Sequence, residues 1–228
     1  QFVSNVSHEL KTPLSSVKVL SESILLQEDV PKEMYVEFLH DINSEVDRMT
    51  AIINDLLTLV KLDQKEIPLN FQEIDLNQLM AGINKRLQPL ADAKGVSLEA
   101  DYLKEITADA DEMKLTLAIS NLVDNAIKYT PEGGTVKVTL DADHQNVFIT
   151  VADTGIGIPE KEVNRIFERF YRVDKTRDRE TGGTGLGLSI THATIMMHKG
   201  SIKVNSKEEE GTTILVRIPL KQQPAAQV

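Results

Sequence analysis

The stretch that decides the first part of the fold is YVEFLHDINSEVDRMTAIINDLLTLV, residues 35–60. Its apolar side chains recur at alternating steps of four and three residues over about four heptads. They are Tyr35, Leu39, Ile42, Val46, Met49, Ile53, Leu56 and Val60. A heptad seam of this length predicts a long helix that needs an apolar partner along its whole length.

The segment that precedes this seam is its expected partner. A helix is predicted from Phe2 to about Gln27, with a break at residues 28–30 and Pro31 as the first residue of the second helix. Because two antiparallel helices bury one seam poorly, we expect a homodimer through residues 1–64 that forms a four-helix bundle. The alternative is a pair of core helices in a monomeric domain.

A different pattern follows Pro68, where glycine enters and helical segments alternate with strands. Asp75 is the expected N-cap of a helix that starts near Leu76, and Gly95 lies just past its end. A second helix is expected over residues 111–129 and a third over 186–198. The expected strands are 71–75, 96–101, 135–140, 147–151, 201–206 and 212–219. This order predicts an α/β sandwich, one sheet with helices on one face. The expected domains are 1–66 and 67–221, with a tail at 222–228.

Composition excludes several classes of function. The 228 residues include 35 acidic and 25 basic side chains, a net charge of -10, which argues against binding to nucleic acid. The absence of cysteine excludes disulfides, cysteine-bound zinc, iron–sulfur clusters and thiol catalysis. No apolar run reaches the roughly 18 residues of a membrane span, and no signal peptide opens the chain. Since the first residue is Gln, we expect an excised fragment.

The clearest candidate nucleophile lies in VSNVSHELKTPL, residues 3–14. On a helical wheel His8 falls opposite the apolar stripe, and Thr12 lies one turn later on the same exposed face. Glu9 can reach one ring nitrogen of His8 and leave the other as a nucleophilic lone pair. Pro13 removes the hydrogen bond to the Glu9 carbonyl, at ~3 kcal/mol, which suggests a built-in bend. An inert surface histidine is the alternative, while a zinc site fails because Thr12 replaces the second histidine of H-E-x-x-H.

Two glycine-rich segments predict an anion site. DTGIGI, residues 153–158, follows a predicted strand, and GGTGLGLS, residues 182–189, opens a helix. Glycine lets backbone N–H groups approach phosphate, and a helix N-terminus favours an anion. Asp153 would accept from the adenine amino group and repel the guanine carbonyl, so we expect ATP rather than GTP. Either segment alone is also compatible with a structural turn.

A polar face on the helix before them fits the same ligand. Asn121, Asn125 and Lys128 lie at i, i+4 and i+7 of NLVDNAIKYTP, residues 121–131. Mg²⁺ on ATP needs only one or two protein oxygens, which asparagine amides can supply, and a lysine can offset phosphate charge. The alternative is a solvated polar face.

An aromatic cluster, FERFYR at residues 167–172, lies between the glycine segments and precedes a polar run to Thr184. These aromatics are expected to anchor a mobile loop with a glycine hinge, although a plain loop packed by aromatics fits as well.

Taken in order, these motifs resemble the cytoplasmic catalytic core of bacterial sensor histidine kinases of the PhoR/WalK-like kind. Residues 8–14 resemble the phosphoacceptor box and residues 121–131 the N box. Residues 153–158 and 183–188 resemble the two glycine boxes, and residues 167–172 the aromatic box. The one mild departure is at Glu210, where relatives commonly carry a second glycine before the position of Gly211; this puts the role of Thr212 in doubt.

The resemblance implies a dimeric phosphotransfer domain followed by a Bergerat-type ATP-binding fold with a mixed sheet. It implies ATP-dependent phosphorylation of His8, transfer to an aspartate of a response regulator, and phosphatase activity in which Thr12 orients water. The implied catalytic residues are His8, Glu9 and Thr12, with Mg²⁺ on Asn125 and Asn121. The implied ATP-binding residues are Asn121, Asn125, Lys128, Tyr129, Asp153, Gly155, Gly157, Ile158, Phe170, Arg172, Gly183, Thr184, Gly185, Leu186, Gly187 and Thr212. Lys175, Arg177 and Arg179 would add positive charge from the lid. The family's membrane spans would precede this fragment, which would be the cytoplasmic portion of a membrane sensor.

Two other classes share part of this pattern. A mechanical ATPase of the gyrase or chaperone type has the same nucleotide pocket, with a catalytic Glu on the N-box helix, where Asp124 is the nearest candidate. Such enzymes lack the histidine box. A non-catalytic dimeric scaffold is the second alternative, and labelling by ATP distinguishes it.

Overall fold

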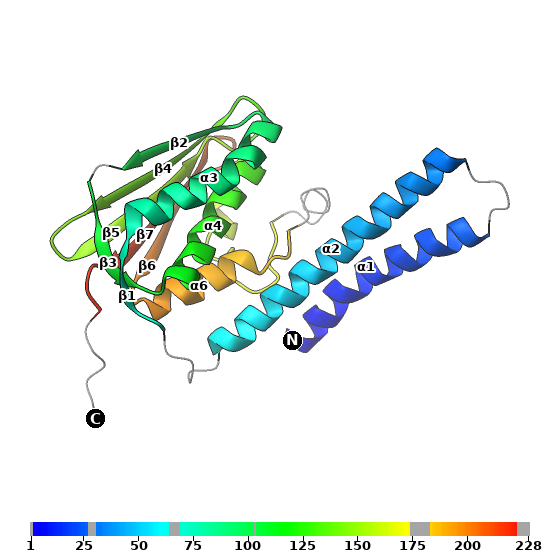
Figure 1. Cartoon of the computed structure of the whole chain (residues 1–228), viewed down its shortest axis with the longest axis horizontal. Coiled ribbons are helices and arrows are strands. Elements are labelled where there is room, and N and C mark those ends of the chain that lie inside the picture. The colour runs from blue at the N-terminus through cyan, green and yellow to red at the C-terminus, as the bar shows by residue number, and fades with distance from the viewer. Residues whose placement is uncertain (1, 27–30, 64–68, 103, 174–182, 223–228) are drawn as a thin grey trace.

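The computed structural model describes residues 2–26, 31–63, 69–102, 104–173 and 183–222, and it has two parts (Figure 1). The first is a hairpin of α1 (Phe2–Leu25) and α2 (Lys32–Asp63), which pack along each other. Helix α2 begins one residue later than predicted, because the Pro31 carbonyl already accepts from the amides of Met34 and Tyr35. The predicted break at 28–30 lies outside the described residues. None of the described helices combines the length and apolar character needed to cross a bilayer.

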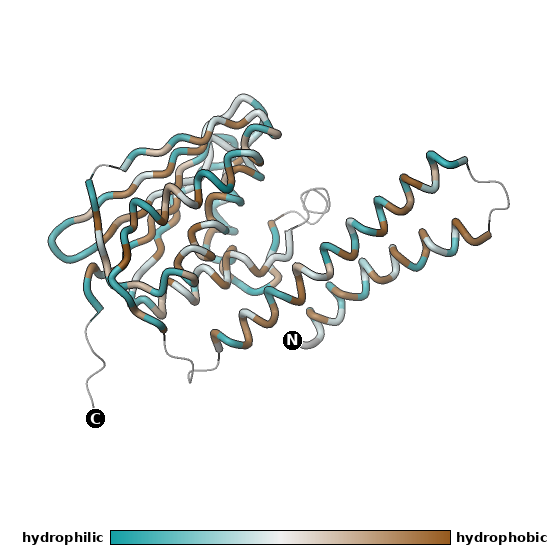
Figure 2. Tube along the Cα trace, in the orientation of Figure 1, coloured by the Kyte–Doolittle hydropathy of each residue, from teal (hydrophilic) through white to brown (hydrophobic). Residues whose placement is uncertain are grey.

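Both hairpin helices carry apolar side chains that no other described residue covers. Hydrophobic turns recur along them (Figure 2). The exposed members include Leu14, Val19 and Leu25 of α1 and Tyr35, Leu39, Val46, Ile53 and Val60 of α2. Five of the predicted seam positions are thus exposed, as expected if a second copy covers them. The helical hairpin is confirmed, and the dimeric four-helix bundle stays a prediction.

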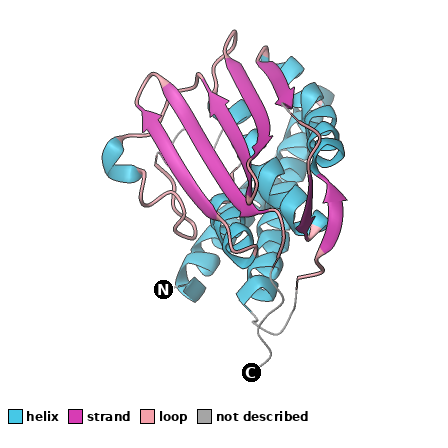
Figure 3. Ribbon diagram, turned by 90° about the vertical axis from the view of Figure 1, so that its left-hand side faces the viewer, coloured by secondary structure: helices cyan, strands magenta, loops and turns pink. Residues whose placement is uncertain are grey.

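The second part is the predicted α/β sandwich. Its five-stranded sheet has the order β2 (Ser97–Tyr102), β4 (Thr135–Ala142), β5 (Asn146–Asp153), β7 (Gly211–Pro219), β6 (Ser201–Lys207). Only β2 and β4 pair in parallel, so the sheet is mixed. Helices α3 (Leu76–Lys94), α4 (Glu112–Tyr129) and α6 (Gly187–Met197) lie on one face and leave the other uncovered (Figure 3). The core lies between this face and the helices.

A separate two-stranded ladder joins β1 (Gln72–Asp75) to β3 (Thr107–Ala110). Strand β3 was not predicted, since TADA has one β-branched residue, Thr107, and no aromatic residue to mark a strand. It forms because Ala108 and Ala110 are buried in the core and all four of its residues pair with β1.

The predicted ends of α3 are confirmed. Asp75 accepts from the Gln78 amide at 3.0 Å, and Gly95 adopts φ 66° while its N–H bonds to the last turn. Helix α4 is the crossover that a parallel β2–β4 pair requires. Its C-terminal end lies beside the loop after β5, where the Ile156 amide donates to the Tyr129 carbonyl at 3.1 Å.

The chain enters the second part at Asn70 and Phe71, and these residues lie beside the buried His198 and its partner Asp111. The Asn70 amide donates to Asp111 at 3.1 Å, and Phe71 packs edge-on against His198. Nε2 of His198 accepts from the Asp111 amide at 3.1 Å, which makes Nδ1 the donor to the Thr194 carbonyl at 2.8 Å. The expected boundary at 66/67 and residues 223–228 of the expected tail lie outside the described residues, so the domain limits stay a prediction. Gln222, the first residue of that tail, is held by the second part, since its Nε2 donates to the His198 carbonyl at 2.9 Å.

Candidate functional site

A cavity of about 720 Å³ lies between the C-terminal half of α4, the loop after β5 and the loop before α6. Most of the predicted ATP-site residues line it: Asn121, Asn125, Lys128, Tyr129, Asp153, Gly155, Gly157, Ile158, Arg172, Gly183, Thr184, Gly185, Gly187 and Thr212. Two others, Phe170 and Leu186, pack instead in an apolar cluster against α2. Four motifs that are far apart in the sequence thus meet around one hollow.

Asp153 is the last residue of β5 and lines this cavity. Its Oδ1 accepts from the amides of Gly155 at 2.8 Å and Thr212 at 3.1 Å. Burial raises the pKa of this carboxyl, and the two amide hydrogen bonds oppose the shift. Because both amides bond to Oδ1, Oδ2 remains to accept from a ligand. Thr212, whose role the sequence left in doubt, contributes its backbone N–H here.

The loop after Asp153 is held from both sides. Gly157 has φ 67°, and a Cβ at this position would lie 2.0 Å from the Lys207 carbonyl oxygen. Only glycine permits this approach. The next amide, that of Ile158, donates to Ser206 Oγ at 2.8 Å, so the β6–β7 turn fixes the loop against the cavity.

The polar face of α4 contributes amides and a cation. Asn121 donates through Nδ2 to the Gly187 carbonyl at 3.3 Å, which leaves its Oδ1 available. Lys128 pairs with Asp124 at 2.7 Å, so Asp124 is engaged in an ion pair within α4. The described residues contain no cluster of three or more His, Cys, Asp or Glu side chains that could hold a metal. The asparagine oxygens fit a hard cation that brings further ligands on phosphate.

The loop before α6 closes the remaining side. The Phe170 amide donates to the Gly185 carbonyl at 2.9 Å, and Arg172 Nη2 donates to the Gly183 carbonyl. These bonds tie the aromatic segment to the glycine segment. The predicted lid cations Lys175, Arg177 and Arg179 lie outside the described residues.

The histidine segment lies on α1. His8 and Thr12 are exposed, as the helical wheel predicts, and Pro13 is buried within a continuous helix. The Thr12 hydroxyl donates to the His8 carbonyl at 3.2 Å. Glu9 is not bonded to His8; its Oε2 lies 4.0 Å from Arg48 Nη2 and 3.8 Å from Arg172 Nη2. The predicted contact between Glu9 and His8 is therefore absent from this arrangement.

Helix α2 also reaches the cavity, which the sequence did not predict. Leu59 is buried with Leu186 and Ile190, and Thr184 Oγ1 donates to Asp55 Oδ2 at 2.6 Å. Asp55 lines the cavity. A second helical stripe, Asp55, Leu59 and Leu62, runs outside the heptad seam and is the signal that would have identified this face.

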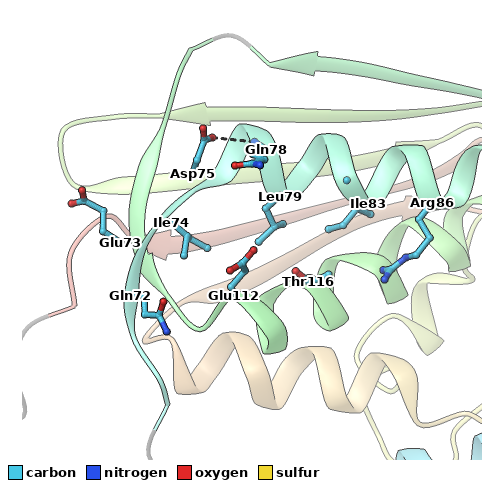
Figure 4. A pocket seen from close by; sticks show the side chains of 11 residues that line it. Gln72, Glu73, Ile74, Asp75, Gln78, Leu79, Ile83, Arg86, Glu112 and Thr116 are labelled. Carbon is cyan, nitrogen blue, oxygen red and sulfur yellow. Dashed lines mark hydrogen bonds between the residues drawn. The ribbon is translucent and has the colours of Figure 1, made fainter.

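A second hollow, of about 530 Å³, lies between β1, α3 and α4 (Figure 4). Three of its four charged lining side chains have structural roles, and two of them are Asp75, which caps α3, and Arg86, which donates to Ser120. Glu73 pairs with Lys221 at 2.6 Å. None of the predicted motifs reaches this hollow, so it is not the candidate site.

Comparison with known proteins agrees with this arrangement. Residues 1–65 match the His Kinase A (phospho-acceptor) domain, and residues 110–222 match the Histidine kinase-, DNA gyrase B-, and HSP90-like ATPase family. The chain is 37% identical over 225 residues to sensor histidine kinase WalK of Bacillus subtilis, covering 98% of this chain and 37% of WalK. It is 36% identical over 212 residues to the phosphate regulon sensor protein PhoR of Pseudomonas aeruginosa, covering 93% and 48%. The chain thus spans half or less of the length of these two relatives.

Solved structures agree with the fold. Full-length ShkA in complex with AMPPNP matches with a TM-score of 0.72 and 28% identity, over 97% of this chain and 46% of ShkA. Histidine kinase ThkA in complex with response regulator protein TrrA gives a TM-score of 0.79 at 24% identity, over 96% and 61%, which supports the fold alone. With a phospho-acceptor hairpin joined to an ATPase-type sandwich, the chain belongs to the sensor histidine kinases.

Proposed function

We propose that this chain binds ATP in the cavity beside Asp153, transfers the γ-phosphoryl group to His8, and passes it to an aspartate of a response regulator. The observation that carries the proposal is the convergence of four separate motifs on one cavity, beside a helix that exposes a histidine. Asp153 Oδ2 would accept from the adenine amino group, and Lys128 and Arg172 would face the phosphates.

In the forward step, His8 Nε2 forms a bond to the γ-phosphorus while the bond from that phosphorus to the bridging oxygen breaks and ADP leaves. Glu9 would accept the hydrogen bond or proton from Nδ1. This role requires the Glu9 carboxylate to leave Arg48 and Arg172, which lie within 4.0 Å of it here. Catalysis then consists of positioning and charge neutralisation.

We propose that ATP binds together with Mg²⁺. The Oδ1 atoms of Asn125 and Asn121 would hold the ion, and bound Mg²⁺ supplies charge neutralisation on the phosphate oxygens. Asn121 is already oriented for this by its bond to the Gly187 carbonyl.

We further propose a homodimer through the helical hairpin, since α1 and α2 expose apolar side chains along their length. The partners would be a second copy of this chain and the receiver domain of a response regulator. By analogy with the relatives, whose names describe sensors, the chain would be the cytoplasmic portion of a membrane sensor.

Labelling with γ-phosphate-labelled ATP tests the proposal. His8→Ala should abolish acid-labile labelling while ATP still binds, because only the acceptor nitrogen is removed. Asn125→Asp should lose labelling with the fold intact. His40→Ala, an exposed histidine on α2, is the matched control and should label normally. Normal labelling of the His8→Ala protein would refute the assignment.

Phosphatase activity is tested at Thr12. Because the hydroxyl lies one turn from His8 on the same exposed face, Thr12→Ala should keep autophosphorylation but slow loss of phosphate from the regulator by about tenfold or more. Thr12→Ser, which retains the hydroxyl, should decay at a rate close to that of the unchanged protein. Equal decay for the alanine and serine variants would contradict a role for the hydroxyl.

A further inference from the structure

Two carboxylates from the helical hairpin reach the residues that would hold the phosphates. Asp55 of α2 accepts from Thr184 at 2.6 Å and lines the cavity itself. Glu9 of α1 lies 3.8 Å from Arg172, which also lines the cavity. Both acids belong to the part of the chain that must separate from the ATP-binding part if His8 is to change its position.

The cations that the structure describes on this side of the cavity, Lys128 and Arg172, are already compensated. Lys128 pairs with Asp124 at 2.7 Å, and its charge also lowers the pKa of Asp55 against the larger, opposite effect of burial. Arg172 Nη2 donates to the Gly183 carbonyl and lies 3.8 Å from Glu9 Oε2. Among the described residues, a terminal phosphate beside Thr184 would meet the Asp55 carboxylate and no uncompensated cation.

Like charges close to each other repel strongly where water is partly excluded. ADP lacks the terminal phosphate, so its charge stays farther from Asp55. The apolar contacts of Leu59 with Leu186 and Ile190 keep the carboxylate in this place.

We propose that Asp55 determines nucleotide selectivity: while α2 is docked, its carboxylate competes with the terminal phosphate of ATP, so the docked chain favours ADP. ATP binding then requires α2 to withdraw from Thr184, which links the choice of nucleotide to separation of the two parts. This inference rests on the proposed ATP site and deepens it.

The test is equilibrium binding of ADP and of a non-hydrolysable imido analogue of ATP, each with excess Mg²⁺, measured by calorimetry on the whole chain. Asp55→Asn keeps an oxygen that can accept from Thr184 and removes only the charge. It should tighten binding of the ATP analogue by about fivefold or more, the lower range of coupling between sites, and change ADP binding by less than about twofold.

Asp41→Asn is the matched control, because it removes an exposed carboxylate from the same helix away from the cavity. It should change neither affinity. Equal effects of Asp55→Asn on both nucleotides, or no effect on either, would overturn the inference. If Asp55→Asn does not fold, Asp55→Ala is read in the same way. Failure of the unchanged protein to bind either nucleotide would instead refute the ATP site.

Discussion

At the scale of a single residue, His198 makes stability depend on pH. Burial lowers its pKa below 6.5, because the neutral ring accepts from the Asp111 amide and the charged ring is poorly solvated. The Thr194 carbonyl and the Asp111 charge oppose this shift, and Lys114 reinforces it. The unfolded chain therefore binds a proton more readily than the folded chain as the pH falls through 6.5.

We expect the free energy of unfolding of the ATP-binding part to fall below this pH, by at most about 1.4 kcal/mol per pH unit from this group. Urea denaturation at a series of pH values on both sides of 6.5 measures this change in the free energy of unfolding. His198→Gln, which keeps a donor and an acceptor but does not titrate, should be less stable near neutrality and show a smaller loss in acid. An unchanged pH dependence in that variant would exclude His198 as the cause.

At the scale of secondary-structure elements, the contact between α2 and α6 holds the two parts together. Leu59 is 1% exposed and packs on Leu186 and Ile190. Leu59→Ala should weaken docking by about 2–5 kcal/mol, as for other buried leucines, without lowering the stability of the sheet domain.

Small-angle scattering should report a larger radius of gyration for Leu59→Ala, and the thermal transition of the ATP-binding part should stay in place. Asn54→Ala, an exposed neighbour on α2, should leave both measurements unchanged. A compact Leu59→Ala protein would indicate that Asp55 and Glu9 suffice for docking.

The sequence predicted most elements of this fold because their signals are local. The seam of α2 follows the heptad period, and the ends of α3 follow from Asp75 and Gly95. Strand β3 was missed, because TADA becomes a strand only through its pairing with β1. Propensity cannot report such a long-range contact.

The sequence also predicted only part of the candidate site, namely the residues that belong to local motifs. Asp153, Asn125 and the glycine segments belong to local motifs, and they meet at one cavity. Asp55 and the pairing of Glu9 with Arg172 depend on how the two parts dock, which no local pattern encodes.

At the scale of the whole molecule, the docked contacts bear on whether His8 is phosphorylated within one subunit or across the dimer. Glu9, adjacent to His8, lies 3.8 Å from Arg172 of the same chain. We expect these two parts of one chain to meet again after α2 withdraws and ATP binds, so that His8 is phosphorylated by its own ATP-binding part. Mixed dimers of a His8→Ala subunit with an Asn125→Asp subunit should not be labelled by ATP.

A dimer of the unchanged chain with a subunit carrying both substitutions serves as the control and should be labelled. Labelling of the first mixed dimer would mean that the ATP-binding part of one subunit phosphorylates the histidine of the other, and would contradict this expectation.

The mixed sheet has a consequence for synthesis of the chain. The helical hairpin forms from contacts between helices that are neighbours in the sequence. The sheet depends on distant residues, since β5 pairs with β7 through residues such as Val151 and Ile214, and β2 can pair with β4 only after α4 has been made. Since local contacts form faster than distant ones, the hairpin folds first during translation. Its exposed apolar side chains are therefore complete while the sheet is still emerging from the ribosome. If the proposed homodimer forms through them, we expect two nascent chains from one message to pair before either chain is able to bind a nucleotide.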